Sequence, residues 1–391
     1  MILNNNRGLR TWLEINKEKL ASNYQVLRGL LQPQTKLLGV VKSNAYGHGL
    51  VEYALELERL GANFIGVDSV LEGFALREAG LKAPILVLGY TLPSNTAEAV
   101  KAQISLTVSS WEWLQEMALE GVKGLRLHLK FDTGMCRQGF FPEEAEKVLN
   151  WLKNKENDII IEGVYTHFAS AKNPAFPAGT KAQMDKFEAV LAEFENFGLK
   201  PIRHASATSG AIVFPEAHYD MVRFGIGLMG LWPSKEVEYA YSDKLNLQPI
   251  LTWKTIVSEV KVVPAGSRVG YDGTELLERE TKIAILPVGY WHGYARSLSS
   301  LGRVVINGHR ARVLGRVSMD MIVVDITDLS VMSEAEGRPV LSGVEVGDEA
   351  ILIGADNKAE FSADEMADLA GSSNYEIVTR LNPLIKRVYI N

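Results

Sequence analysis

The sequence has only one cysteine, Cys136, among its 391 residues, so it cannot form an intrachain disulfide, and a reducing compartment fits. No uncharged apolar run approaches the roughly 20 residues of a membrane-spanning helix, and the N-terminal MILNNNRGLR lacks the apolar core of a secretory signal. There is no excess of positive charge either, because the formal net charge is −6. These absences predict a cytoplasmic protein with neither a membrane nor a nucleic acid as partner.

The composition is ordinary for a globular protein, with 47% apolar and 23% charged residues. The length allows two domains, or one barrel with an addition. Neither a low-complexity tract nor an internal repeat is visible. The order of the predicted elements must therefore reveal the fold.

Short apolar runs alternate with amphipathic helical stretches over the first two-thirds of the chain. Eight such runs in 200–250 residues are typical of a (β/α)8 barrel, although a doubly wound open sheet would give the same alternation. The predicted strands are 37–41, 63–68, 84–90, 104–108, 125–131, 159–168, 202–206 and 221–230.

The last third changes character and becomes rich in β-branched residues, with turns at Pro-Ala-Gly and Asn-Gly. This pattern predicts a mainly antiparallel β domain. We place the barrel in residues 1–245 and the β domain in 246–391, and we expect the first strand, 11–16, to pair with the β domain.

Candidate catalytic and binding residues occur at the carboxyl ends of the predicted barrel strands. In a barrel these strand ends all lie around one mouth. Taken singly, each has a simpler explanation: a histidine can be a satisfied core residue, and an arginine can be half of an ion pair. Their joint placement favours one active site. The residues are Lys42, Tyr46, Lys130, Asp132, Arg137, His167, His204, Thr208, Ser209, Arg223, Gly225 and Ile226.

Lys42 follows the buried run LLGVV directly. A lysine at a strand end is usually a solvated cap, but desolvation at a barrel mouth would make its amine easier to deprotonate, as covalent catalysis requires.

Four segments resemble the alanine racemase family: VVKSNAYGHG, KFDTGMCRQGF, VYTHFA and MVRFGIGLMG. Similarity extends from about Thr11 to Arg387. The resemblance implies a PLP-dependent racemase that interconverts L- and D-alanine for peptidoglycan. It also implies a homodimer in which the β domain of one subunit covers the barrel mouth of the other.

The same resemblance assigns roles to individual residues. Lys42 would carry PLP and serve as one base, and Tyr271 of the partner subunit would be the second. His167 would contact that tyrosine. Arg223 would contact both His167 and the pyridine nitrogen, and His204 would belong to the same cofactor-binding set.

The remaining assignments concern the phosphate and the substrate. The phosphate would be bound by Tyr46, Thr208 or Ser209, Tyr375, Gly225 and Ile226. Arg137 would hold the phenolic oxygen of the cofactor and, together with Met319, the substrate carboxylate. Tyr290 and Tyr375 would keep the pocket small. Lys130 matches a lysine that many relatives carry as a carbamate. The resemblance implies no metal.

Several positions depart from the family pattern. Ser318 replaces a frequent cysteine, Cys136 stands where Gly or His is common, and Ala207 replaces an asparagine. Lys172 and His292 replace acidic residues of the family's access corridor, which affects substrate preference more than reaction type.

Three alternative functions make different demands on the sequence. A decarboxylase of the same architecture would have a glutamate at position 223 and a cysteine in the β domain, whereas this chain has Arg223 and no cysteine beyond Cys136. A PLP carrier built from the barrel alone would not need Tyr271 or Met319. A racemase of serine, lysine or several amino acids stays open.

Overall fold

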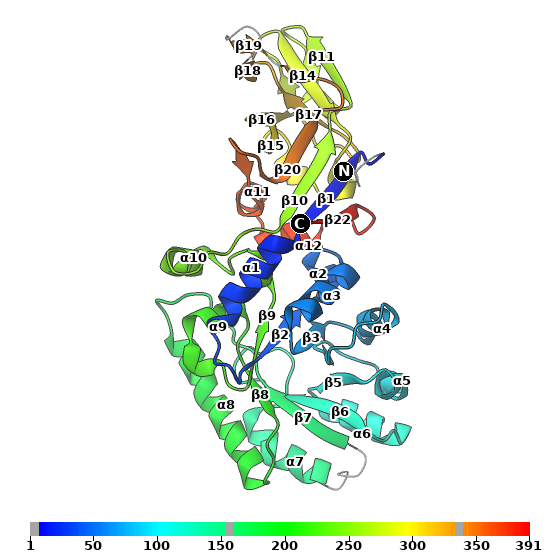
Figure 1. The fold of residues 1–391 in the computed structure, drawn as a ribbon, viewed down its shortest axis with the longest axis vertical. Helices are drawn as coiled ribbons and strands as arrows, with labels where there is room; N and C mark the ends of the chain where they lie inside the picture. Colours follow the sequence, from blue (N-terminus) through cyan, green and yellow to red (C-terminus); the bar gives the residue numbers. More distant parts are fainter. Residues whose placement is uncertain (1–7, 154–158, 333–338, 342) are drawn as a thin grey trace. The chain divides into compact units, whose positions relative to one another are not determined.

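The computed structural model describes residues 8–153, 159–332, 339–341 and 343–391; the first seven residues, part of the segment considered above as a signal, lie outside the described residues. The chain forms two compact units (Figure 1). The barrel unit comprises Glu18–Ala45 and Leu50–Gln248. The β unit comprises the N-terminal segment up to Lys17, the short insertion Tyr46–Gly49, and the chain from Pro249 onward.

The barrel unit is built on eight parallel strands in the spatial order β8-β7-β6-β5-β4-β3-β2-β9. The Arg223 N–H donates to the Ser206 carbonyl at 3.0 Å, and a bridge joins Ala207 to Arg223, so the ends of the sheet nearly close. The strands are β2 (Lys36–Val40), β3 (Phe64–Val67), β4 (Ile85–Val87), β5 (Ile104–Val108), β6 (Leu125–Lys130), β7 (Ile159–Tyr165), β8 (Ile202–His204) and β9 (Met221–Phe224). Each overlaps a predicted strand, and the predicted fold class is confirmed.

Helices follow the strands, as the alternating pattern predicted. Several begin with a serine side chain that accepts a hydrogen bond from the third helical residue, which satisfies an otherwise unpaired N–H group. The α-helices are α1 (Lys17–Arg28), α3 (Leu50–Leu60), α4 (Val70–Glu78), α5 (Thr96–Lys101), α6 (Trp111–Glu120), α7 (Ala145–Lys153), α8 (Ala178–Asn196), α9 (Thr208–Val213) and α10 (Lys235–Tyr241). In the residues described, none of the helices is both long and apolar enough to cross a membrane.

A ten-stranded, mainly antiparallel sheet forms the β unit. The first strand of the chain, β1 (Thr11–Asn16), belongs to this sheet: it pairs antiparallel with β10 and parallel with β22. The other strands of the sheet are β10 (Leu251–Ile256), β11 (Glu259–Val263), β14 (Thr281–Leu286), β15 (Arg303–Ile306), β16 (His309–Leu314), β17 (Ile322–Asp325), β20 (Glu349–Ala355), β21 (Glu360–Phe361) and β22 (Lys386–Ile390).

The predicted Asn-Gly turn joins β15 to β16. Asn307 and Gly308 both have positive φ, at 48° and 82°, and Ile306 pairs directly with His309. Two residues with positive φ form the tight hairpin turn that matches strand twist. Two short helices precede the last strand, α11 (Ala363–Ala370) and α12 (Asn374–Thr379).

Candidate active site

Arg223 lies at the centre of the polar groups in the barrel unit. Its side chain is almost fully buried, with 3% of the residue exposed, and it donates only to uncharged acceptors. Nη1 donates to His204 Nδ1 at 2.9 Å, and Nη2 donates to His167 Nδ1 at 3.0 Å and to the carbonyls of Thr166 and Ala205 at 3.0 and 2.8 Å. Among the described residues no carboxylate contacts it. Burial lowers the pKa of Arg223 to about 10, so it remains a cation at neutral pH.

The contacts of Arg223 fix the protonation of two histidines. A guanidinium can only donate, so both Nδ1 atoms must be acceptors and each ring carries its proton on Nε2. Burial and the charges of Arg223, Arg137, Lys130 and Lys42 lower the pKa of His167 to about 3. His167 is therefore a neutral hydrogen-bond donor at physiological pH.

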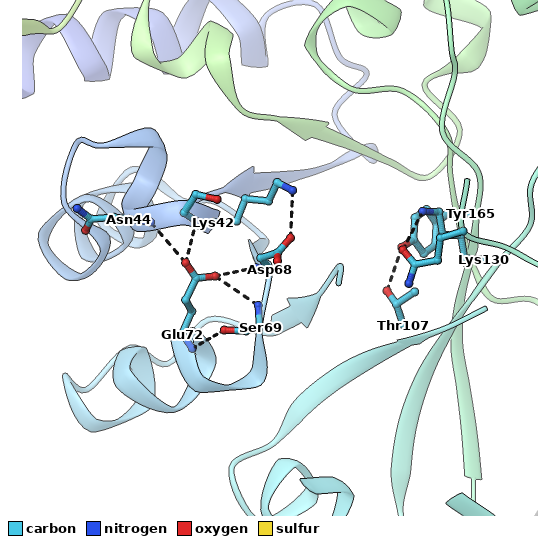
Figure 2. Close-up of polar contacts among 10 residues, drawn as sticks. Lys42, Asn44, Asp68, Ser69, Glu72, Thr107, Lys130 and Tyr165 are labelled. Atoms are coloured by element: carbon cyan, nitrogen blue, oxygen red, sulfur yellow. Dashed lines mark hydrogen bonds and ion pairs between the residues drawn. The ribbon is translucent and has the colours of Figure 1, made fainter. Parts of the chain in front are cut away.

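The aromatic ring of Tyr165 packs against His204 and Arg223. Its ring stacks on His204 with centroids 4.6 Å apart, and the Arg223 guanidinium lies 5.1 Å from its centroid. Its hydroxyl is 3.0 Å from Thr107 Oγ1, an interaction drawn in Figure 2. Burial raises the pKa of Tyr165 to about 12, so the side chain is uncharged and favours a nearby cation.

The loop after β6 is shaped by Asp132. Its carboxylate accepts hydrogen bonds from the N–H groups of residues 134–137, at 2.6–3.1 Å. Burial would raise the pKa of Asp132, but these four backbone bonds lower it. The carboxylate is thus used to hold the loop that carries Arg137, and Cys136 within this loop has a φ of 55°.

Lys130 ends β6 with its amine mostly buried and 3.3 Å from Gln138 Oε1. Burial and the charges of Arg137 and Arg223 lower the pKa of Lys130 to about 8. The protonated amine still predominates near physiological pH, but its neutral fraction is far larger than that of an ordinary lysine.

The low pKa of Lys130 gives a test of the expected carbamate. Only a neutral amine reacts with carbon dioxide, so at constant dissolved carbon dioxide the carbamate should increase as pH rises through about 8. Carbon-13 NMR with labelled bicarbonate should show a signal that Lys130→Ala abolishes and that replacement of the exposed Lys123 leaves unchanged. A signal that survives Lys130→Ala would refute the assignment to Lys130.

Lys42 follows β2 and is partly exposed in the single chain. Its side chain is 38% exposed, and its amine lies 3.1 Å from Asp68 Oδ1 (Figure 2). In the single chain the amine is therefore only partly desolvated. A carboxylate at the end of the neighbouring strand β3 orients the lysine.

The four residues after Lys42 form a left-handed turn. Ser43, Asn44, Ala45 and Tyr46 have φ between 49° and 57°, and none of them is glycine. Such a conformation costs about 1–2 kcal/mol for each residue with a side chain. The surrounding structure must therefore hold this turn in place, and the sequence alone gave no sign of it.

Glu72, on α4, holds the left-handed turn (Figure 2). Its Oε1 accepts from the N–H of Ser43 at 2.7 Å and of Asn44 at 3.4 Å. Its Oε2 accepts from the N–H of Asp68 at 2.8 Å and of Ser69 at 3.4 Å. One carboxylate thus joins the loop after Lys42 to the loop that carries its partner, Asp68.

Replacing Glu72 with glutamine should destabilise the protein and lower its activity. An amide has one acceptor oxygen, so two of the four backbone N–H groups lose their acceptor; the bonds are exposed or partly buried, and each contributes about 0.5–1.5 kcal/mol. Glu78→Gln, at the exposed end of the same helix, is the matched control for thermal unfolding. Equal melting temperatures for the two variants would show that Glu72 does not hold the turn.

The predicted phosphate-binding residues of the barrel unit lie together. Thr208 Oγ1 accepts from the N–H groups of Gly225 at 3.3 Å and Gly227 at 3.4 Å, and Ser209 is buried beside it on α9. A Cβ on Gly227 would lie 2.6 Å from Thr208 Cγ2, so glycine is required for this approach. Of the two hydroxyls, Thr208 is the one that contacts the turn of Gly225 and Ile226.

The other two predicted phosphate ligands belong to the β unit. The rings of Tyr46 and Tyr375 lie 6.3 Å apart at a tilt of 52°. Burial, with a contribution from Tyr46, raises the pKa of Tyr375 well above its ordinary value. Gly47 permits the tight approach of this insertion, since a Cβ there would lie 2.0 Å from the Val378 carbonyl.

Tyr271, Met319 and Tyr290 lie on three linked loops of the β unit. All three side chains are exposed, Tyr271 by 69%. An ion pair between Asp272 and Arg316, at 3.1 Å, ties the Tyr271 loop to the segment before Met319. The Tyr290 N–H donates to the Ser318 carbonyl at 3.0 Å. The β unit thus presents these predicted residues at its surface, with Trp291 also exposed beside them.

The two corridor substitutions differ in their surroundings. Lys172 is exposed, and its carbonyl accepts from Ser234 Oγ at 2.7 Å. His292 is 5% exposed, and its Nδ1 accepts from the Gly289 N–H at 3.2 Å. His292 therefore closes a local turn, which its identification as a corridor residue did not anticipate.

Several polar residues that the structure links to the site had no predicted role. Asp68 directly follows β3, and Glu72 lies on α4, the next helix. No function was predicted for residues at the end of β3. His128 and Glu162 lie within β6 and β7 and contact each other at 3.2 Å. The available signal was Gly163, because an isolated glycine in a strand indicates a bulge or a close approach.

Two family models match most of the chain. The model described as alanine racemase, N-terminal domain, matches residues 15–233, and that described as alanine racemase, C-terminal domain, matches residues 250–389.

Curated relatives and solved structures agree with these matches. Alanine racemase 1 of Clostridium acetobutylicum is 39% identical over 97% of this chain and 95% of its own length, and alanine racemase of Carboxydothermus hydrogenoformans is 40% identical over 97% and 99%. The alanine racemase structure from Bacillus anthracis with bound L-Ala-P superposes with a TM-score of 0.89 at 31% identity, covering 98% of this chain and 95% of that one.

Proposed function

Because this chain belongs to the alanine racemase family, a family of isomerases, we propose that it interconverts L- and D-alanine with PLP as cofactor, in a homodimer whose active sites are shared between subunits. The product D-alanine would supply peptidoglycan synthesis in the cytoplasm. The observation that carries the proposal is the buried arginine between two neutral histidines, Arg223 with His167 and His204.

The charges at the barrel mouth fit an anionic cofactor and substrate. Lys42, Lys130, Arg137 and Arg223 all act on His167. The carboxylate of Asp68 pairs with Lys42, and that of Asp132 accepts from backbone N–H groups, so Lys130, Arg137 and Arg223 have no carboxylate partner among these groups. A phosphate, a phenolic oxygen and a substrate carboxylate would balance this excess of positive charge. The donor set therefore fits PLP with an amino acid.

The residues that would hold PLP follow from the matched motifs. Lys42 would bind it covalently, and Arg223 would donate to its ring nitrogen. Arg137 would bind the phenolic oxygen and, with Met319, the substrate carboxylate. The phosphate would be bound by Tyr46, Thr208, Ser209, Gly225, Ile226 and Tyr375. When bound, PLP supplies the electron sink that makes the α-hydrogen of an amino acid acidic.

Racemisation requires proton removal on one face and proton delivery on the other. Lys42 would serve one face and Tyr271 of the partner subunit the other. A tyrosine is a weak base unless its phenolate is stabilised. The Nε2–H of His167, fixed by Arg223, would donate to that phenolate.

A panel of amino acids with added PLP, scored by chiral chromatography, tests the function. Alanine should be interconverted fastest and should reach equal amounts of both enantiomers, because enantiomers have equal free energy. Tyr290 and Tyr375 should exclude bulky side chains. One methylene contributes only about 1–3 kcal/mol of discrimination, so serine should react slowly. Faster turnover of lysine or arginine would refute alanine as the substrate, and loss of the carboxyl group would indicate a decarboxylase.

Reduction with borohydride should attach the cofactor permanently to the peptide that contains Lys42. The motive is the position of Lys42 after β2, oriented by Asp68. Peptide mapping by mass spectrometry locates the label, and Lys42→Ala should carry none. Label on Lys130, the other lysine of the site, would refute the assignment.

A further inference from the structure

A continuous chain of hydrogen bonds runs through the interior of the barrel from Arg223 to Glu162. Arg223 contacts His204 Nδ1 at 2.9 Å, and His204 Nε2 lies 2.9 Å from His128 Nδ1. His128 Nε2 lies 3.2 Å from Glu162 Oε2. These four residues come from four barrel strands, and His128 and His204 are completely buried.

The direction of every bond in this chain is determined by its ends. Arg223 can only donate, so His204 must accept at Nδ1 and carry its proton on Nε2. That proton can only be donated to His128 Nδ1, which places the His128 proton on Nε2. The Glu162 carboxylate accepts this last proton. Both imidazoles are therefore neutral, in agreement with the lowering of both pKa values by burial.

The backbone is built to permit this arrangement. The β6–β7 ladder has a register shift at Leu127/His128: Leu127 pairs with Ile161 and His128 with Gly163, which leaves Glu162 unpaired. Bulges of this kind re-aim side chains near functional sites. A Cβ on Gly163 would lie 2.1 Å from His128 Nδ1, so only glycine leaves room for the ring.

Glu162 is held as an ionised acceptor. It also accepts from Ser105 Oγ and lies 3.0 Å from Arg126 Nη1. Burial would raise the pKa of Glu162, but the hydrogen bonds from His128 and Ser105 and the charge of Arg126 lower it. The chain therefore ends on a carboxylate that cannot donate.

We propose that Glu162 is a positioning residue for Arg223, acting through His128 and His204 by fixing the tautomer of each ring. Without an acceptor at position 162, the buried His128 Nε2–H would have no partner. If His128 switched to the Nδ1–H tautomer, its proton would face the His204 Nε2–H. His204 would then be driven to its own Nδ1–H tautomer, whose proton would face Arg223 Nη1. The catalytic consequence rests on the proposed function; the tautomer chain does not.

Nitrogen-15 NMR of the cofactor-free protein, labelled at histidine, tests the chain directly because the two tautomers have different ring shifts. The parent should show Nε2–H at His128, His204 and His167, with signals assigned by single His→Gln variants. Glu162→Met should convert a measurable fraction of His128 and His204 to Nδ1–H. Glu162→Gln keeps an acceptor oxygen and should preserve the parental tautomers.

Ser105→Ala is the matched control, because it removes a neighbour of Glu162 but leaves the carboxylate. A role of Glu162 confined to bonding Ser105 and Arg126 would leave the histidine tautomers of Glu162→Met unchanged, and that result would overturn the proposal. An Nδ1–H tautomer of His204 in the parent protein would also overturn the proposal. This measurement does not depend on the folding of any variant.

The consequence for the reaction is read with PLP bound. Glu162→Met should lower kcat for alanine with little change in KM, because Arg223 loses one of the acceptors that hold its guanidinium in place. Ser105→Ala should leave kcat unchanged. Altered tautomers with unchanged kinetics would overturn the role of Glu162 in the reaction. If no amino acid is racemised at all, the proposed function fails, while the NMR result still decides whether the tautomer chain exists.

Discussion

Replacing Arg223 with glutamate is expected to lower the rate of alanine racemisation strongly and to raise transamination. An arginine can only donate, so it would leave the ring nitrogen of the cofactor unprotonated, whereas a carboxylate would favour a protonated nitrogen and a stronger electron sink. A weaker sink favours rapid proton exchange over side reactions. Pyruvate formation and chiral chromatography measure the two products in one reaction mixture.

Arg223→Gln separates the loss of the guanidinium from the gain of a carboxylate. The amide should slow racemisation without raising transamination, because it cannot protonate a ring nitrogen. The melting temperature of each variant must be measured, because Arg223 also binds His167, His204 and two carbonyl groups. If Arg223→Glu racemised alanine as fast as the parent with the same side products, Arg223 would not lie at the ring nitrogen.

Mixing inactive Lys42→Ala and Tyr271→Phe dimers is expected to restore about a quarter of the parental activity, as two-fold symmetry requires. Each homodimer lacks one acid–base group at every site. In a mixed dimer one site receives both substitutions and the other receives neither. Random reassortment of equal amounts makes about half of the dimers mixed, each with one intact site.

Subunit exchange must be shown independently, with two affinity tags on the mixed species. The matched control uses Tyr239→Phe in place of Tyr271→Phe. Tyr239 is an exposed tyrosine on α10, so the Tyr239→Phe homodimer should stay active. If exchange is complete and the mixture of Lys42→Ala and Tyr271→Phe stays inactive, the two residues do not form a site across subunits.

The positions of the barrel strands could be predicted because strands buried on both faces are short apolar runs between polar loops. Strand β5, ISLTV, is buried at every position. The carboxyl ends of such strands share one edge, so the grouping of Lys130, His167, His204 and Arg223 followed from the strand order alone.

The left-handed turn after Lys42 could not be predicted, because nothing in Ser-Asn-Ala-Tyr favours positive φ at four successive residues. The conformation is imposed by Glu72, which is 29 residues from Ser43 in the sequence. For the same reason the ion-pair partner of Lys42 could not be predicted: Asp68 follows a neighbouring strand, and its approach to Lys42 depends on the fold.

The chain from Arg223 to Glu162 was missed for a different reason. Strict alternation along β7 places Glu162 on the opposite face from Gly163 and Ile161, but the bulge breaks this alternation. His128 was read as part of the apolar run LRLHLKF. A glycine next to a glutamate inside a buried strand was the one local sign that the regular pattern ends there.

The isotope content of D-alanine formed from L-alanine in deuterium oxide, with PLP present, tests the central claim most directly. Two acid–base groups on opposite faces remove one hydrogen and deliver another, so the account predicts that the first D-alanine formed carries solvent deuterium at its α-carbon. D-alanine that retains the original hydrogen would show that a single group carries the proton across, and it would contradict the paired roles of Lys42 and Tyr271.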